Sequence, residues 1–258
     1  MILTIDIGNT HTVLGLWKGE QLLDTLRIHT DRDKTADEYH LLVKNLLRNL
    51  PGTYAPETDI EGGILSSVVP ALKSVMAEAM KLMTGKDFLV VGPGLKTSLN
   101  IRMDNPAQLG ADLVVDSIAA LAKYPPPLVI FDMGTATTMS VIDKTGAYRG
   151  GLIIPGLKLS VDALSARAAQ LPYIYLGEPA RFIGSNTIDC MQAGAVYGGA
   201  AMIDGLIART EEELGQPVTA VGTGGLMALI HKYCKKDLHY DENLMLEGLR
   251  LLYQKNVS

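Results

Sequence analysis

Two aspartates, each with a glycine two residues later, end two apolar segments that lie about half a chain apart. Leu3-Thr4-Ile5 leads into Asp6-Ile7-Gly8-Asn9-Thr10, and residues 128–131 lead into Asp132-Met133-Gly134-Thr135. Carboxylates bind a cation or its waters, glycine permits a tight turn, and loop N–H and hydroxyl groups donate to phosphates. The pair predicts an ATP site between two halves of the chain. An ordinary turn is the alternative, because Asp-x-Gly-x-Thr is common in turns.

Two other segments could contribute chemistry. Asp112 follows Gly110-Ala111 early in a predicted helix over 107–123, and phosphoryl transfer to a hydroxyl needs a nearby base. The alternative for Asp112 is an acid that only complements the helix dipole. The glycine turn at 222–225 would let the backbone approach a flat ligand such as adenine; its alternative is a plain strand-to-helix turn.

The composition is that of a globular protein without a basic surface. The chain has 258 residues, is 47% hydrophobic and carries a formal net charge of -5, and Lys235-Lys236 is its only adjacent basic pair. We therefore expect no nucleic-acid partner. No cationic leader precedes Asp6 and no run of about 18 apolar residues follows, so we expect a cytoplasmic protein without a membrane segment. Cys190 and Cys234 lack the spacing of a metal site and are expected to be free thiols.

The order of predicted elements is the same in both halves. Strands are expected at 2–6, 12–17 and 21–27, followed by a helix with Thr35 as N-cap and Glu38 three residues later. A strand near 63–68, a helix at 71–83 and a strand at 88–91 complete the first half, residues 1–106.

The second half, residues 107–258, repeats this plan after the helix over 107–123. Strands are expected at 128–132, 137–143 and 147–152, with helical segments at 155–171 and 189–207, the latter rich in glycine and alanine and predicted to pack closely against a neighbour. A last strand near 218–222 precedes helices near 226–233 and 243–254. The pattern predicts an α/β fold with a duplicated domain.

Many further motifs follow in order along nearly the whole chain. They are Ile64-Leu65-Ser66-Ser67-Val68-Val69-Pro70, Gly92-Pro93-Gly94-Leu95-Lys96-Thr97, Asp104-Asn105-Pro106, Gly110-Ala111-Asp112, Phe131-Asp132-Met133-Gly134-Thr135-Ala136-Thr137-Thr138, Gly151-Leu152-Ile153-Ile154-Pro155-Gly156 and Gly184-Ser185-Asn186-Thr187. With Asp6-Ile7-Gly8-Asn9-Thr10, this order resembles the type III pantothenate kinases of the acetate and sugar kinase and actin superfamily. The resemblance implies two duplicated ribonuclease H-like (actin-like ATPase) domains with a cleft between them. It also implies ATP-dependent phosphorylation of pantothenate to 4'-phosphopantothenate, the first step of coenzyme A biosynthesis.

The resemblance assigns roles to matching residues. The ATP phosphates would be held by Asp6, Ile7, Gly8, Asn9, Thr10, His11, Thr12, Val13 and Thr135, with Asp6 acting through Mg²⁺. Asp132 would hold a monovalent cation, K⁺ or NH₄⁺, and Asp112 would accept the hydroxyl proton. Pantothenate would be contacted by Met103, Gly110, Ala111, Asp112, Leu113 and Thr187. Thr187 would reach across a subunit interface, which implies a homodimer with its active site at that interface.

Three positions depart from the family pattern. Leu113 stands where the family has arginine, Met103 replaces a tyrosine, and Ser98 replaces a glycine. The first change removes a cation beside an anionic substrate and the second a phenolic hydrogen bond. Either the pocket is rebuilt, with Arg102 or Lys96 supplying charge, or the affinity or the substrate has changed.

Two alternative functions therefore stay open. One is a regulatory or binding protein that keeps the fold and the dimer, and the other is a kinase for another small hydroxy acid. Retention of Asp6, Asp112 and Asp132 favours an active kinase.

Overall fold

The computed structural model describes residues 1–52 and 54–257, and the chain forms two compact units. The first unit contains Met1–Ser98, Ala107–Ala119 and Met245–Ser258; the second contains Leu99–Pro106 and Ala120–Leu244. Both units are assembled from segments distant in sequence. The expected domain bounds at 1–106 and 107–258 stay a prediction. Within the described residues, no helix is both long and apolar enough to span a bilayer.

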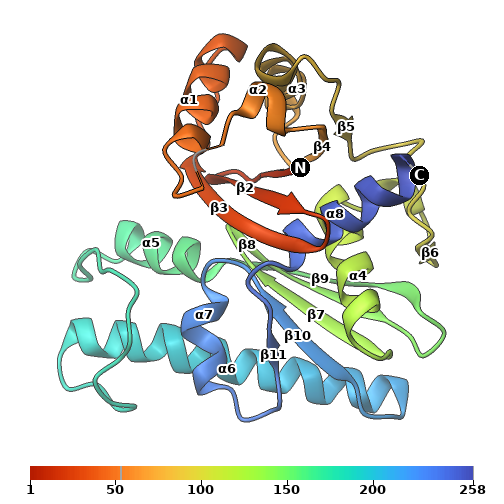
Figure 1. The fold of residues 1–258 in the computed structure, drawn as a ribbon. Helices are drawn as coiled ribbons and strands as arrows, with labels where there is room; N and C mark the ends of the chain where they lie inside the picture. Colours follow the sequence, from red (N-terminus) through yellow and green to blue (C-terminus); the bar gives the residue numbers. More distant parts are fainter. Residues whose placement is uncertain (53, 258) are drawn as a thin grey trace. The chain divides into compact units, whose positions relative to one another are not determined.

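The first unit is built on a five-stranded sheet in the order β3-β2-β1-β4-β5 (Figure 1). Its strands are β1 (Ile2–Ile7), β2 (His11–Lys18), β3 (Gln21–His29), β4 (Gly62–Ser67) and β5 (Leu89–Val90). β1, β2 and β3 form an antiparallel meander, whereas β4 joins β1 in parallel and β5 joins β4 in parallel. The sheet therefore has a hairpin tip beside the carboxyl end of a parallel pair.

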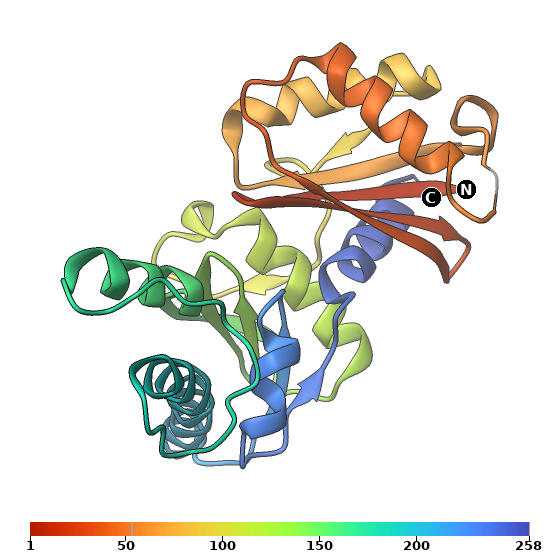
Figure 2. The ribbon, with the colours of Figure 1, turned by 90° about the vertical axis from the view of Figure 1, so that its left-hand side faces the viewer.

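Side-chain alternation gives this sheet two buried faces. Leu3, Ile5 and Ile7 of β1 pack in a core with α1 (Ala36–Arg48) and α3 (Pro70–Thr84), which lie side by side (Figure 2). On the other face, Ile64 of β4 packs in a second cluster with residues of α4 (Ala111–Lys123) and α8 (Leu244–Val257). The short α2 (Pro56–Asp59) leads into β4.

The N-terminus of α1 has the predicted capping box. The Glu38 N–H donates to the Thr35 hydroxyl over 3.3 Å, and the Thr35 N–H donates to the Glu38 carboxylate over 2.8 Å. Both interactions satisfy N–H groups that the helix leaves without a partner. This expectation from the sequence is confirmed.

The second unit contains a six-stranded sheet in the order β11-β10-β7-β8-β9-β6. Its strands are β6 (Asn100–Ile101), β7 (Leu128–Met133), β8 (Ala136–Ile142), β9 (Ala147–Pro155), β10 (Thr219–Thr223) and β11 (His239–Tyr240). Its helices are α5 (Leu157–Arg167), α6 (Thr187–Leu214) and α7 (Met227–Ile230), and the 3-10 helices of the chain are η1 (Pro106–Gln108) and η2 (His231–Tyr233). One stripe of α6, which includes Val196, Ile203 and Ile207, packs on the core against Val129 and Phe131 of β7.

The two sheets repeat one design. The strand order β9-β8-β7-β10-β11 matches β3-β2-β1-β4-β5, and β6 is an added strand. Asp6 pairs in register with Ser66 of β4, and Asp132 pairs with Thr223 of β10. Each aspartate is thus the next-to-last residue of the first strand and lies opposite a hydroxyl-bearing residue. The predicted duplication is therefore present, whereas the two-residue strands β6 and β11 were not expected.

The glycines of α6 do not pack as the sequence suggested. A Cβ added at Gly194, Gly198 or Gly205 would meet nothing within 4 Å in the described part of the chain. These glycines and Ala201 repeat at four, three and four residues and are exposed. Gly199 alone faces the core, next to Ile230. The small-residue stripe is therefore on the open face of α6.

Candidate functional site

The loop between β1 and β2, residues Gly8-Asn9-Thr10 and hereafter loop 1, is tied to its surroundings by backbone hydrogen bonds. The Gly8 N–H donates to the His11 carbonyl over 3.0 Å, and the Thr10 carbonyl accepts from the Thr30 N–H over 2.9 Å. A Cβ at Gly8 would lie 2.9 Å from the His11 carbonyl oxygen, which excludes most side chains there. Asn9, Thr10 and His11 are exposed. Loop 1 therefore presents amide, hydroxyl and backbone donors from a fixed backbone, as phosphate binding requires.

Some residues that flank loop 1 are buried in the core, and others remain accessible at the candidate site. Ile7 is buried in the apolar core, and the Thr12 hydroxyl is buried in a 3.0 Å hydrogen bond with the Thr30 hydroxyl. Of the predicted ATP residues, Ile7 and Thr12 therefore use their side chains for packing. Asp6 is half-buried beside Ser66, whose buried hydroxyl has no hydrogen-bond partner among the described residues.

The loop Gly134-Thr135 between β7 and β8, hereafter loop 2, resembles loop 1 in its bonding. The Gly134 N–H donates to the Ala136 carbonyl over 3.0 Å. Two glycines lie against this loop and the strand before it: a Cβ at Gly156 would collide with the Thr135 carbonyl, and one at Gly224 would collide with the Asp132 carboxylate. Gly224 also has a φ of 91°, which favours glycine. Gly156 therefore leaves space for loop 2, and Gly224 leaves space for Asp132 at the end of β7.

The glycine turn at 222–225 has structural uses that the sequence did not reveal. Gly222 makes room for the Met227 side chain, and Gly224 makes room for Asp132. The predicted approach of this turn to adenine stays a prediction.

The acidic residues of the site do not form a metal cage. No group of three or more His, Cys, Asp or Glu side chains suited to a metal ion occurs in residues 1–52 and 54–257. Mg²⁺ in phosphoryl-transfer enzymes is usually held by one or two carboxylates, by waters and by the substrate phosphates. One carboxylate beside a phosphate loop, as at Asp6, fits that mode.

Asp112 lies in the first turn of α4, and its position depends on Gly110. A Cβ at Gly110 would collide with the Asp112 carboxylate, which folds back over this glycine. Ala111 packs against the cluster around Ile64 and Val115. Leu113, at the position of the family's arginine, is half-buried and brings no charge to this turn.

Lys96 and Arg102, the two cations considered as replacements, belong to different units. Lys96 belongs to the first unit, as does Asp112. The Lys96 N–H donates to the Asn256 side-chain oxygen over 2.9 Å, and the Asn256 side-chain N–H donates to the Lys96 carbonyl over 3.1 Å. Ser98, two residues later, has a φ of 58°, a conformation that favours the glycine of the family pattern, and accepts a hydrogen bond from Lys255. Arg102 belongs to the second unit.

Thr187 and Met103 both belong to the second unit. Thr187 is the first residue of α6, after the N-cap Asn186, whose side chain accepts from the Asp189 N–H over 2.9 Å. A Cβ at Gly184 would come within 2.5 Å of the Cys190 nitrogen, so the glycine of this motif permits close packing on the helix start. Thr187 lines an open hollow of about 660 Å³ with residues 169–172. Met103 follows β6 and is half-buried.

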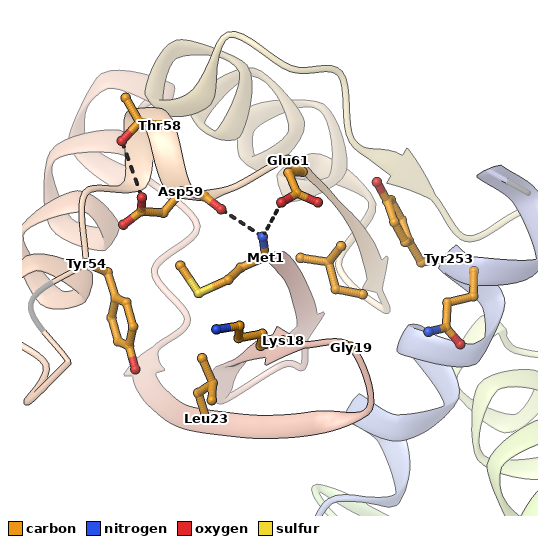
Figure 3. A pocket seen from close by; sticks show the side chains of 11 residues that line it. Met1, Lys18, Gly19, Leu23, Tyr54, Thr58, Asp59, Glu61 and Tyr253 are labelled. Atoms are coloured by element: carbon orange, nitrogen blue, oxygen red, sulfur yellow. Dashed lines mark hydrogen bonds and ion pairs between the residues drawn. The ribbon is translucent and has the colours of Figure 1, made fainter.

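A second hollow of about 750 Å³ lies in the first unit, at the opposite end of β1 from Asp6 (Figure 3). It is lined in part by Met1, Lys18 and Tyr253. The Met1 ammonium group donates to the Asp59 carbonyl over 2.8 Å and to the Glu61 carboxylate over 2.9 Å. None of the predicted site residues lines it.

Comparisons with known proteins agree with this geometry. A model of the type III pantothenate kinase family matches residues 2–209. The chain is 46% identical over 256 residues, 99% of both proteins, to a type III pantothenate kinase from an Exiguobacterium species (strain AT1b). Among solved structures, it resembles a candidate Baf family transcriptional activator from Campylobacter jejuni (TM-score 0.59, 19% identity, 99% of this chain and 98% of that chain). It also resembles a candidate N-acetylmannosamine kinase from Listeria monocytogenes (TM-score 0.58, 12% identity, 100% of this chain and 99% of that chain).

The duplicated sheets with their acid-bearing loops define a protein with the fold of the actin-like ATPases and sugar kinases. Within this class, the chain belongs to the type III pantothenate kinase family. The fold class and the family predicted from the sequence are confirmed. The roles of individual residues stay predictions.

Because Gly110 lies against the Asp112 carboxylate, we predict that a side chain at position 110 lowers activity and leaves the fold intact. Gly110→Ala places a methyl group against the Asp112 carboxylate and displaces it, and a displacement of about 1 Å can slow an enzyme roughly 10²-fold. We expect kcat to fall while the melting temperature stays within a few degrees of the wild type. Gly92→Ala is the matched control, because a Cβ there meets nothing within 4 Å. Wild-type kcat in Gly110→Ala would contradict this prediction.

Proposed function

We propose that this chain transfers the γ-phosphoryl group of ATP to the primary hydroxyl of pantothenate in the cytoplasm, giving 4'-phosphopantothenate for coenzyme A synthesis. The observation that carries the proposal is the duplicated acid-bearing hairpin, with Asp6 and Asp132 at equivalent sheet positions, in a chain of the type III pantothenate kinase family.

The triphosphate would be bound by loop 1. Its backbone N–H groups and the Thr10 hydroxyl donate to phosphate oxygens, and Asp6 holds Mg²⁺ directly or through water. Mg²⁺, when bound, neutralises charge on the phosphates. Thr135 in loop 2 adds a further contact. Catalysis of this kind depends mainly on positioning and charge, which the fixed backbone of both loops supports.

Asp112 would accept the proton of the pantothenate hydroxyl as the phosphoryl group arrives. Gly110 supports this role because its missing side chain leaves room for the carboxylate. Pantothenate would lie against Gly110, Ala111, Leu113 and Met103. Lys96, exposed and held by its backbone to Asn256, would supply the cation that Leu113 does not.

A kinase for another small hydroxy acid is the second candidate. Leu113 and Met103 favour it, because neither can make the charged or phenolic contact of the family pattern. A regulatory protein of this family would bind ATP or pantothenate without turnover.

The active unit would be a homodimer with its site at the subunit interface. The small-residue stripe of α6 is exposed, and large apolar side chains around its start are exposed as well, including Tyr173, Tyr175, Phe182 and Ile183 at 68 to 94%. Exposed apolar surface of this kind is typical of an interface, and stripes of small residues let helices approach closely. Thr187 would then contact pantothenate bound to the partner.

The first test is turnover of ATP that depends on pantothenate. We expect the wild type to form phosphopantothenate with Mg²⁺ and K⁺ and Asp112→Asn to lower kcat roughly 10²- to 10⁴-fold, the usual loss for a general base. Product formation is followed by mass spectrometry, and binding of MgATP by calorimetry shows that the variant is folded.

Three outcomes separate the candidates. Pantothenate-dependent turnover supports the proposed function, turnover only with another hydroxy acid in a substrate panel supports the second candidate, and binding without turnover supports the regulator. Full activity of Asp112→Asn would remove the base assignment.

The cation role of Asp132 is tested separately. We propose that the Asp132 carboxylate, which lies against Gly224, holds K⁺ or NH₄⁺. Asp132→Asn should therefore lose the stimulation by K⁺ over Na⁺ at equal ionic strength. The measurement is the initial rate against K⁺ concentration. An unchanged K⁺ response would reject this role.

The dimer is tested by a bulky residue on the α6 stripe. Gly198→Leu should halve the mass measured by light scattering and raise KM for pantothenate, while the helix itself is not weakened because leucine favours helices. Ala71→Leu, at an exposed position of α3, is the control. If the Gly198→Leu protein stays dimeric, the small-residue stripe of α6 is not the dimer interface.

A further inference from the structure

Arg32 lies between β3 and α1, in none of the motifs that resemble the family, and is directed at loop 1. Its guanidinium group donates to the Asn9 side-chain oxygen over 2.9 Å, and both residues are exposed. The two residues are 23 positions apart, so the contact depends on how the β3–α1 connection folds against the β1–β2 hairpin.

The β3–α1 connection is built rigidly around its neighbour Asp31. The fully buried Tyr39 accepts from the Asp31 N–H over 3.0 Å and donates to the Asp31 carbonyl over 2.7 Å. The Asp31 carboxylate accepts from the Asp33 N–H and pairs with Lys34. The hydrogen bond from Lys34, followed by that from Asp33, lowers the pKa of Asp31. Position 32 is therefore held from both sides. Of the two acids that flank it, Asp31 pairs with Lys34, and Asp33 forms no ion pair within residues 1–52 and 54–257.

The guanidinium group of Arg32 has a single hydrogen-bond partner in the part of the chain that the structure describes. Arginine carries five N–H donors in a fixed fork, and in residues 1–52 and 54–257 its one hydrogen bond is to Asn9, with no ion pair. His11, the first residue of β2 after loop 1, is a poorer source of positive charge, because partial desolvation of its ring, followed by the charges of Arg27 and His29, lowers its pKa. Arg32 is thus a permanent cation with unused donors at a loop that presents amides and hydroxyls to an anion.

We propose that Arg32 is a further residue of the nucleotide site, which fixes Asn9 and donates its remaining N–H groups to the terminal phosphates of ATP. This inference rests on the proposed binding of ATP at loop 1, although it does not depend on which hydroxy acid is phosphorylated. A guanidinium fork suits phosphate oxygens better than an ammonium group does.

The test is calorimetric binding of MgATP, MgADP and AMP to the full-length wild type, Arg32→Met, Arg32→Lys and the control Arg48→Met. Arg48 is exposed in the same unit and pairs with Glu57, so its loss changes the net charge equally. Loss of one charge-assisted hydrogen bond corresponds to about a tenfold or greater rise in Kd. We expect that rise for MgATP in Arg32→Met, a smaller rise in Arg32→Lys, and AMP binding near wild type in every variant.

Steady-state kinetics supply a second readout. KM for ATP should rise more than kcat falls in Arg32→Met, and the difference from the wild type should shrink as salt is added. Thermal melting confirms that each variant is folded.

The binding results either support or overturn the role of Arg32 in the nucleotide site. MgATP affinity in Arg32→Met equal to that of Arg48→Met would overturn it, and so would an equal loss for MgATP and AMP, which would indicate only a distorted loop. A selective loss of MgATP binding without pantothenate turnover in the wild type would support Arg32 while removing the proposed substrate. A wild type that binds no MgATP would overturn both proposals.

Discussion

The candidate site depends on carboxylates that occupy the space beside glycines. Asp132 lies against Gly224 and Asp112 lies against Gly110, and in each pair a Cβ on the glycine would collide with the carboxylate. Each glycine leaves the carboxylate in a place that a larger residue would take from it, so the acid keeps the position in which a phosphate or a cation would meet it. The fold of the chain places Gly224 beside Asp132, and the start of α4 places Gly110 beside Asp112.

The duplicated sheet explains why the acids occur where they do. A hairpin tip lies beside the carboxyl end of a parallel strand pair in both units, and ligands of open α/β sheets bind beyond the carboxyl ends of such strands. The next-to-last residue of the first strand is close to that end but is still fixed by the ladder on both sides, as Asp6 is between Val13 and Ser66. The same strand design thus places one carboxylate in each unit.

Two cations of the first unit, Lys96 and Arg32, lie in connections outside its helices and strands. Leu113 leaves the first turn of α4 without a cation, whereas Lys96 and Arg32 lie in connections held by other elements: Asn256 of α8 in one case and Tyr39 of α1 in the other. Both connections are fixed through backbone atoms, which leaves the cationic side chain at each position available for a ligand. The C-terminal helix therefore contributes to the site region although it carries none of the predicted site residues.

The sequence by itself determined the family, the order of the elements, the duplication and the capping of α1, because these depend on local patterns of apolar residues, turns and hydrogen-bonding side chains. It also identified the two aspartates at the strand ends. The tertiary structure decided that Gly224 lies beside the Asp132 carboxylate. The two residues are 92 positions apart along the chain, and the pairing of β10 with β7 brings them together. The tertiary structure likewise decided that the glycines of α6 face outward and that Arg32 meets Asn9. Contacts between distant segments leave no periodic signal in the chain, so only the fold reveals them.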